Sequence, residues 1–369
     1  PPRNRRQRQM CIRDRDDKGK PGGRIRFLED TDGDGLYDKS TVFLEPIAYP
    51  MGVLPWRKGV LVTAAPEIFY AEDTDGDGRA DVRQTLFAGF GQGNQQHRVN
   101  HPRWGLDNWV HAANGDSGGT IKSLKTGQTV NISGRDLRFK PDEGRIDPQT
   151  GQTQFGTNRD DWGNWFGCNN SNPAWLYAVA DHYLRRNPHV APPPGRVDVT
   201  PDRTVYPVGR VISHCDLKHR PHATWGEPGR WTSAAGVTIY RDELFGPHFA
   251  GNLFVNDSVY TVVHRRVLHA DGVVFRGERG PDERDREFLA THDIWSRFST
   301  QETGPDGALW VLDMYRFVIE HPEWIHDDLE KTLDLRAGHN KGRIYRIYPV
   351  DRKPRPIPRL DTLDTAGLV

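Results

Sequence analysis

"RFLEDTDGDGLYDKSTVF" (26–43) returns as "FYAEDTDGDGRADVRQTLF" (69–87), so the chain contains an internal repeat. The leading aspartates of the two copies, Asp30 and Asp73, lie 43 residues apart. A period of about 40–45 residues that is made of short strands is typical of one blade of a β-propeller. The repeat therefore predicts an all-β propeller with an acidic loop at the tip of each of two hairpins.

Other segments support short strands joined by tight turns. "MGVLPWRKGVLVTAA" (51–65) alternates apolar residues around a charged turn, and a strand–turn–strand pattern recurs at 104–114, 251–265 and 304–317. A closed ring of blades explains how so many strands avoid exposed edges. Helical periodicity is nearly absent, and "PEWIHDDLEKTLDL" (322–335) predicts one short helix with Pro322 in its first turn.

Composition narrows the function classes. The 369 residues are 35% hydrophobic and 27% charged, with 38 Gly and 27 Pro, which is typical of a turn-rich globular protein of one large or two ordinary domains. The formal net charge is zero, so no overall field favours nucleic acid or an anionic membrane as a partner. No run of 18 apolar residues occurs, so no transmembrane segment is predicted in this chain.

The ends differ in composition from the rest. Residues 1–15 are rich in arginine and lack the apolar stretch of a signal peptide, so we expect a disordered or artefactual tail. Residues 16–350 are predicted to form the propeller, whose first blade lacks its early strands. Residues 351–369 resemble a Pro-rich linker to a missing C-terminal module.

Three cysteines, Cys11, Cys168 and Cys215, form neither a disulfide framework nor a CxxC metal motif. Two alternatives stay open for Cys168 and Cys215. They form a bridge in an oxidising compartment, or both are reduced.

The two acidic loops are candidate calcium sites. Each places aspartates at positions 1, 3, 5 and 9 and a glycine at position 6, and the position-7 carbonyl adds a further oxygen ligand. Four carboxylates in nine residues repel one another unless a hard cation holds them. Position 12 is Thr41 or Gln84 rather than glutamate, and strands flank both loops, so these are not EF-hands. The alternative is a plain acidic turn. The candidate ligands are Asp30, Asp32, Asp34, Leu36 and Asp38 in the first loop and Asp73, Asp75, Asp77, Arg79 and Asp81 in the second.

Several longer stretches carry a family resemblance. They are "NQQHRVNHPRWGLDNWVHAANGDSGG" (94–119), "QFGTNRDDWGNWFGCNNSNP" (154–173), "TSAAGVTIYRDELFGPHFAGNLFVND" (232–257), "GPDGALWVLDMYRFVIEHPEWI" (304–325) and "GRIYRIYP" (342–349). Together they resemble the membrane-bound dehydrogenases of planctomycete type, the PVC-type haem-binding proteins, over roughly residues 20–350.

That family carries a propeller similar to the glucose/sorbosone dehydrogenases that use pyrroloquinoline quinone (PQQ). The resemblance implies six blades, a periplasmic or extracellular location with membrane association, a sugar or alcohol substrate and a cytochrome c electron acceptor. Members often continue into HEAT-like repeats and a CxxCH cytochrome module, which this chain lacks, so it resembles a fragment.

The resemblance also implies a catalytic base. In the sugar dehydrogenases the base-bearing segment reads Asn-His, Gly-Arg-Leu, a GPDG turn and a strand that ends Gly-Asp; here Asn100-His101 and a strand that ends at Gly115-Asp116 are similar, although GPDG is absent. Oxidation of an alcohol through a quinone needs a base that titrates near neutral pH, as histidine does. The alternative is a histidine that hydrogen-bonds its own loop.

Candidate cofactor ligands follow from the same resemblance. Arg135 in "SGRDLRFKPDEG" stands where the pattern has an arginine that grips the quinone carboxylates, but Asp136 replaces its asparagine. A forked guanidinium can bind a carboxylate through two bonds, and a structural ion pair is the alternative for each arginine. The full candidate set is Arg103, Arg135, Asp161, Asn164 and Arg297. Trp104, Trp162 and Trp165 are predicted to pack rather than to stack on a ligand.

Two functions fit these observations. One is a quinone-dependent oxidoreductase, and the other is a calcium-stabilised, non-catalytic propeller that binds carbohydrate or protein. Fold does not separate them. A cluster of Arg, Asn and His at one end of the channel would favour the enzyme. A serine hydrolase is disfavoured because no GxSxG segment accompanies His101.

Overall fold

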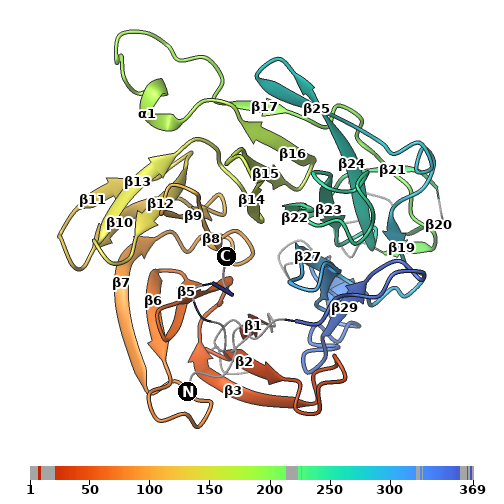
Figure 1. The fold of residues 1–369 in the computed structure, drawn as a ribbon, viewed down its shortest axis with the longest axis horizontal. Helices are drawn as coiled ribbons and strands as arrows, with labels where there is room; N and C mark the ends of the chain where they lie inside the picture. Colours follow the sequence, from red (N-terminus) through yellow and green to blue (C-terminus); the bar gives the residue numbers. More distant parts are fainter. Residues whose placement is uncertain are drawn as a thin grey trace. The chain divides into compact units, whose positions relative to one another are not determined.

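The computed structural model describes residues 7–9, 21–212, 223–225, 227–320, 325, 327–357, 364 and 366–367. Over these residues the chain is almost entirely β-structure (Figure 1). Two single-turn helices interrupt the strands, α1 (Asp181–Leu184) and α2 (Asp327–Glu330). The helix predicted over 322–335 is therefore limited to α2 among the described residues.

The chain divides into two compact units. One unit comprises Pro1–Pro148 with Pro354–Val369, and the other comprises Gln149–Lys353. The prediction from sequence was one domain over 16–350.

The first unit contains three antiparallel sheets, of which the third positions the candidate base. The sheet β1-β2-β3 comprises β1 (Gln7–Gln9), β2 (Gly23–Glu29) and β3 (Lys39–Ile47). The sheet β11-β10-β7-β6-β5-β4 comprises β4 (Gly52–Trp56), β5 (Gly59–Ala64), β6 (Glu67–Glu72), β7 (Val82–Phe90), β10 (Gly119–Ser123) and β11 (Thr129–Asn131). The sheet β13-β12-β9-β8 comprises β8 (Asn100–Trp104), β9 (Val110–Ala113), β12 (Asp136–Lys140) and β13 (Arg145–Gln149).

The segment expected to be a tail contributes β1, which pairs with β2 in the register Arg8↔Arg26. The hairpin predicted over 51–65 forms as β4 and β5, which close at Trp56↔Gly59.

The second unit is also built from antiparallel sheets. Its four-stranded sheet comprises β14 (Thr157–Arg159), β15 (Trp165–Asn169), β16 (Asn172–Tyr177) and β17 (Arg196–Asp198). A five-stranded sheet comprises β22 (Ala234–Ile239), β23 (Leu253–Asp257), β24 (Val262–Asp271), β25 (Val274–Glu278) and β26 (Leu289–Ala290). The last sheet comprises β27 (Phe298–Thr303), β28 (Leu309–Asp313) and β29 (Arg343–Ile347). Two short pairs complete the unit, β18 (Thr204–Val205) with β21 (Gly229–Arg230) and β19 (Arg210–Ile212) with β20 (Ala223–Trp225).

Alternation of apolar residues buries one or both faces of these sheets. In β2, Ile25 and Phe27 point into the core, whereas β5 and β22 are buried along almost their whole length. In the first unit Leu61, Ile68 and Phe139 belong to one fully buried cluster, whose packing fixes the sheet that carries β8.

Strands that follow one another in sequence lie side by side in the sheets, as in the blades of a propeller. The fold is an all-β propeller, as the repeat predicts, and the number of six blades stays a prediction. None of the described helices has the length and apolar character needed to span a membrane.

Candidate active site

His101 lies in a β-bulge at the start of strand β8. The register of β8 against β9 shifts between Asn100, which faces Ala113, and Arg103, which faces His111. His101 takes a left-handed backbone conformation with φ of 51°. The left-handed conformation costs a residue that has a Cβ about 1–2 kcal/mol. β-Bulges often occur next to active sites, where they change the direction of a side chain. The side chain is half-buried.

Strand β4 makes room for this bulge. A Cβ on Gly52 would lie 2.4 Å from Pro102 Cδ and 3.0 Å from the backbone nitrogen of His101. Only glycine allows so close an approach. Just before these strands, the Arg98 guanidinium lies 4.2 Å from the ring centroid of Tyr49, which itself has a φ of 49°. Segments 49–52 and 98–102 thus run side by side.

The surroundings of His101 disfavour its charged form. Burial, with a further contribution from the positive charge of Arg103, lowers the pKa of His101 from 6.5 to about 3. The imidazole is therefore neutral at physiological pH and can accept a proton.

Arg135 is held on the same edge of the sheet as His101. Ala113 at the end of β9 faces Asn100, and the next residue, Asn114, donates its side-chain amide to the carbonyl of Arg135 at 2.7 Å. Arg135 is half-buried as a residue, and its guanidinium donates a hydrogen bond to the carbonyl of Asn131 at 2.8 Å. Asp136, the departure from the family pattern, accepts the backbone N–H of Asn114 at 2.9 Å. The aspartate therefore fixes the turn that carries Arg135.

Asp161 and Asn164 lie in the connection between β14 and β15 in the second unit. Asn164 donates its side-chain amide to Asp160 Oδ2 at 2.7 Å and its backbone N–H to Asp160 Oδ1 at 2.8 Å. Asp161 is paired with Arg241. This loop follows β14, the first strand of its sheet, whereas His101 lies at the beginning of β8, the first strand of the other sheet. The contacts of both residues suit a stabilised turn rather than the predicted cofactor ligands.

Arg297 does not suit the predicted carboxylate clamp either. Its side chain is 1% exposed, and its guanidinium donates to the carbonyls of Arg316, Ser258 and Phe317 at 2.9, 3.2 and 2.8 Å. Burial lowers the pKa of this guanidinium, which nearby carboxylates partly offset. Because its Nε, Nη1 and Nη2 each bond a main-chain oxygen, Arg297 ties three segments of the second unit together.

The three tryptophans, all predicted to pack, differ in exposure. Trp162, at the tip of the loop that Asp160 closes, is 81% exposed, so the expected packing role is wrong for this residue. Trp104 at the end of β8 is 38% exposed, and Trp165 is half-buried.

The two acidic loops adopt the same conformation at hairpin tips. Glu29 pairs with Lys39 around the first loop and Glu72 with Val82 around the second. In each, the first aspartate accepts two backbone N–H groups; for Asp30 the donors are Gly33 at 2.7 Å and Gly35 at 3.0 Å, and for Asp73 they are Gly76 and Gly78 at 2.6 and 3.0 Å.

The carboxylates of these loops suit a hard cation. Ligand atoms of Asp30, Asp32 and Asp34 lie within 4.8 Å of one another, as do those of Asp73, Asp75 and Asp81. Oxygen donors at this spacing suit Ca²⁺. A hydrogen bond from Thr31 lowers the pKa of Asp38, and one from Thr74 lowers that of Asp81, so both carboxylates are kept ionised. Asp38 lies outside the first group of three, although the sequence includes it among the ligands.

Sequence reasoning missed Tyr49 and Arg98. They come together only because the segments that precede β4 and β8 lie next to each other beside the His101 bulge. Sequence reasoning also missed a pair on β9 and the preceding turn, where His111 Nε2 lies 3.2 Å from both carboxylate oxygens of Asp107. Burial raises the pKa of Asp107, but hydrogen bonds and charges from His111 and Arg138 outweigh it and lower that pKa to about 2.

Cys168 is buried, and its thiol donates to the Phe155 carbonyl at 2.9 Å. Cys215, the partner considered from sequence, lies outside the described residues, as does Cys11.

A family model described as "Domain of unknown function (DUF7133)" matches residues 6–351. The chain belongs to the DUF7133 family. No curated protein matches this DUF7133 member.

Among solved structures, a Thermus thermophilus protein described as an oxidoreductase (glucose dehydrogenase) is 15% identical, with a TM-score of 0.50, over 93% of this chain and 99% of that one. This likeness shows the fold. A glucose dehydrogenase is 14% identical with a TM-score of 0.49, over 93% of this chain and 99% of that one. The PQQ-bound aldose sugar dehydrogenase of Streptomyces coelicolor is 16% identical with a TM-score of 0.45, over 85% of this chain and 93% of that one.

Proposed function

We propose that this DUF7133 chain is a quinone-dependent oxidoreductase that oxidises a sugar or another alcohol, with His101 as the general base. The observation that carries the proposal is the left-handed bulge of β8. His101 adopts a backbone conformation that glycine adopts without strain. Strained backbone conformations of this kind cluster at active sites and ligand-binding positions. Arg135 precedes strand β12 at the same end of this sheet, and it is the cation that the proposal assigns to the cofactor.

His101 would take the hydroxyl proton of the substrate. A bound quinone such as PQQ would supply the hydride acceptor. The neutral imidazole of His101 would accept the hydroxyl proton through Nδ1 or Nε2, and the hydride from the substrate C–H bond would go to the quinone. A pKa of about 3 makes the free imidazole a weak base. An anionic cofactor beside Arg103 would offset its charge and raise that pKa toward the working pH.

The cofactor would be held by the cations on this edge. Arg135 and Arg103 can each offer a forked donor to a carboxylate, which a planar quinone with acidic groups presents. Asp161, Asn164 and Arg297 are not included because their contacts already use the relevant groups.

Calcium at the two acidic loops would stabilise the first unit rather than take part in the reaction. Both loops connect strands of that unit at the tips of hairpins. Three further parts of the proposal rest on the family resemblance alone. They are a location in the periplasm or at the cell surface, kinship with haem-binding proteins, and transfer of electrons to a cytochrome c.

The test is reconstitution of the protein with PQQ and Ca²⁺, followed by an assay of a panel of sugars and alcohols with an artificial electron acceptor. Loss of a general base commonly costs about 10²- to 10⁴-fold in rate, so His101→Gln is expected to lower kcat by that factor while PQQ affinity stays unchanged. Arg135→Ala should instead weaken PQQ binding first.

Two matched variants serve as controls. His269→Gln makes the same change at an exposed histidine of the second unit, and Arg145→Ala removes an exposed arginine of the same sheet that pairs with Glu143. Both should retain turnover and PQQ affinity. Failure of the reconstituted protein to bind PQQ would contradict the proposal.

The second candidate is a calcium-stabilised propeller that binds carbohydrate or protein without redox chemistry. The exposed Trp162 favours it, because an indole ring held outward by a closed loop can stack on a sugar ring. Under this alternative, Trp162→Ala abolishes carbohydrate binding while His101→Gln leaves it unchanged.

A further inference from the structure

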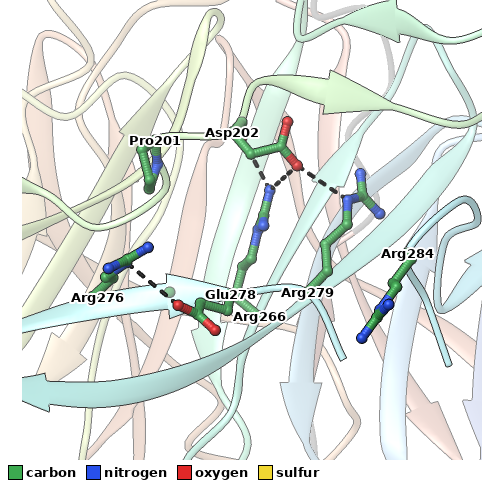
Figure 2. A pocket seen from close by; sticks show the side chains of 8 residues that line it. Pro201, Asp202, Arg266, Arg276, Glu278, Arg279 and Arg284 are labelled. Carbon is green, nitrogen blue, oxygen red and sulfur yellow. Dashed lines mark hydrogen bonds and ion pairs between the residues drawn. The ribbon is translucent and has the colours of Figure 1, made fainter. Parts of the chain in front are cut away.

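A pocket lined by arginines lies on the outer strands of the five-stranded sheet in the second unit. Its volume is about 260 Å³. Pro201 and Asp202 line it from the connection between β17 and β18, and the other lining residues come from β24, β25 and the segment that follows: Arg266, Arg276, Gly277, Glu278, Arg279 and Arg284 (Figure 2).

Close backbone packing forms one side of the pocket. The N–H of Gly277 donates to the carbonyl of Val199 at 2.7 Å, and a Cβ on Gly277 would lie 2.7 Å from that same oxygen. The connection before Pro201 is therefore bonded directly to β25, so the pocket is preformed rather than assembled by exposed side chains alone.

One carboxylate is shared by two buried arginines. Asp202 Oδ2 accepts from Arg266 Nη2 at 3.0 Å and from Arg279 Nε at 3.2 Å. The side chains of Arg266 and Arg279 are only 2% and 8% exposed. A second carboxylate, Glu287, which is not among the lining residues, accepts from Arg279 Nη2 at 3.1 Å.

The remaining donors are not satisfied by the protein. Arg266 Nε is buried without a hydrogen-bond partner, and Arg284 forms no hydrogen bond or ion pair within the described part of the chain. Figure 2 shows the Arg284 side chain beside Arg279 with no interaction drawn to it. The fourth arginine, Arg276, pairs with Glu278 at 3.4 Å, and both are more than half exposed.

The charge of the pocket is therefore positive. Four arginines line the pocket but only two carboxylates, Asp202 and Glu278, so its formal net charge is positive. The net charge stays positive when Glu287 is included. Burial lowers the pKa of Arg266 and outweighs the opposing effect of Asp202.

We propose that this pocket binds a small oxyanion, either a phosphate group or a carboxylate, between Arg284, Arg276 and the Arg266–Asp202–Arg279 cluster. Arginine recognises both groups through parallel N–H···O bonds. A volume of about 260 Å³ leaves room for the small organic molecule that carries the anionic group. The site is separate from the bulge of β8 and does not depend on the oxidoreductase proposal.

The experiment is a calorimetric titration of the full chain with inorganic phosphate at constant ionic strength, balanced with sodium chloride. Saturable binding is expected. Exposed charge pairs contribute up to about 1 kcal/mol, so Arg284→Gln should weaken phosphate binding by roughly threefold to fivefold. Glu278→Gln should tighten it by a similar factor, because it frees Arg276 and removes a repelling charge.

Control variants make the same chemical changes elsewhere in the unit. Arg186→Gln and Glu243→Gln alter exposed residues outside the pocket and should leave the affinity unchanged. Equal effects of the pocket and control variants would show an adventitious ion only, and absence of saturable binding to every probe would also overturn the proposal. Parallel titrations with sulfate and succinate distinguish a tetrahedral oxyanion from a carboxylate, and neutral glycerol should not bind.

Discussion

Two bulges of the same construction occur in the first strands of two sheets, and they differ in the residue at their centre. In β22 the register shifts between Ala235 and Thr238, with Gly236 at φ 66°; in β8 it shifts between Asn100 and Arg103, with His101 at φ 51°. Glycine adopts this conformation without strain, and histidine does not.

The neighbouring strands explain where each bulge finds its space. A Cβ on Gly236 would lie 2.6 Å from Thr300 Cα of β27, so the backbone of the next sheet fills the space beside that bulge. Beside His101 the glycine is on the neighbouring strand instead, at Gly52, where a Cβ would strike Pro102. The bulge of β22 is thus built for packing, whereas the bulge of β8 accommodates a strained side chain.

Withdrawal of calcium should affect the unit with the His101 bulge and not the unit with the Gly236 bulge, because both acidic loops belong to the first unit. A ligand at a hundredfold excess over its Kd stabilises by about 2.7 kcal/mol per site, so two sites contribute about 5 kcal/mol. Hydrogen exchange after chelation should accelerate in β2, β3, β6 and β7. Unchanged exchange there would mean that the loops are plain acidic turns.

The variant Gly236→Ala tests the packing role of the second bulge. The added Cβ meets the backbone of Thr300 and carries the left-handed strain, so we expect a loss of about 3 kcal/mol in the free energy of unfolding. Urea unfolding measures it. Gly251→Ala is the control, since Gly251 also has a positive φ but a Cβ added there would meet no atom within 4 Å. A similar loss in both variants would assign the whole effect to φ.

A change of pH should separate the two bulges, because only one contains a titratable group. The folded pKa of His101 is about 3 against an ordinary value of 6.5, so only the unfolded chain takes up a proton as the pH falls below 6.5. Between pH 7 and pH 5 this residue should cost roughly 1–2 kcal/mol of stability. The loss should be smaller by that amount in His101→Gln, and identical pH profiles would contradict the lowered pKa.

The smallest expected effect is a gain in stability. His101→Gly relieves the left-handed strain but adds entropy to the unfolded chain, so a net gain of about 0.5 kcal/mol is expected at pH 7. Thermal unfolding measures it together with turnover. If the variant were both less stable and fully active, His101 would be a packing residue and the base assignment would fail.

Parts of the fold and site were accessible from sequence because they depend on local patterns. The two DxDxDGxxD loops and the hairpin at 51–65 follow from residue spacing, and the structure places each between paired strands. His101 and Arg135 were accessible through family motifs, although nothing local showed that Asn114 and Asp136 would hold Arg135 at the edge where His101 lies. The burial of Arg297 and the exposure of Trp162 could not be predicted from the sequence, because they depend on neighbours that are distant in sequence.

The sequence by itself determined the all-β class and the repeated acidic loops, because spacing and turn chemistry act over a few residues; the candidate base came from the family resemblance and stays a prediction. Tertiary structure alone decided three other matters. His101 lies in a left-handed bulge that Gly52 makes possible. Arg297 donates hydrogen bonds to three main-chain carbonyls. Arg266, Arg279 and Arg284 line one pocket. These outcomes depend on which strands pack together, and that choice is made by the burial of the whole apolar core rather than by any local segment.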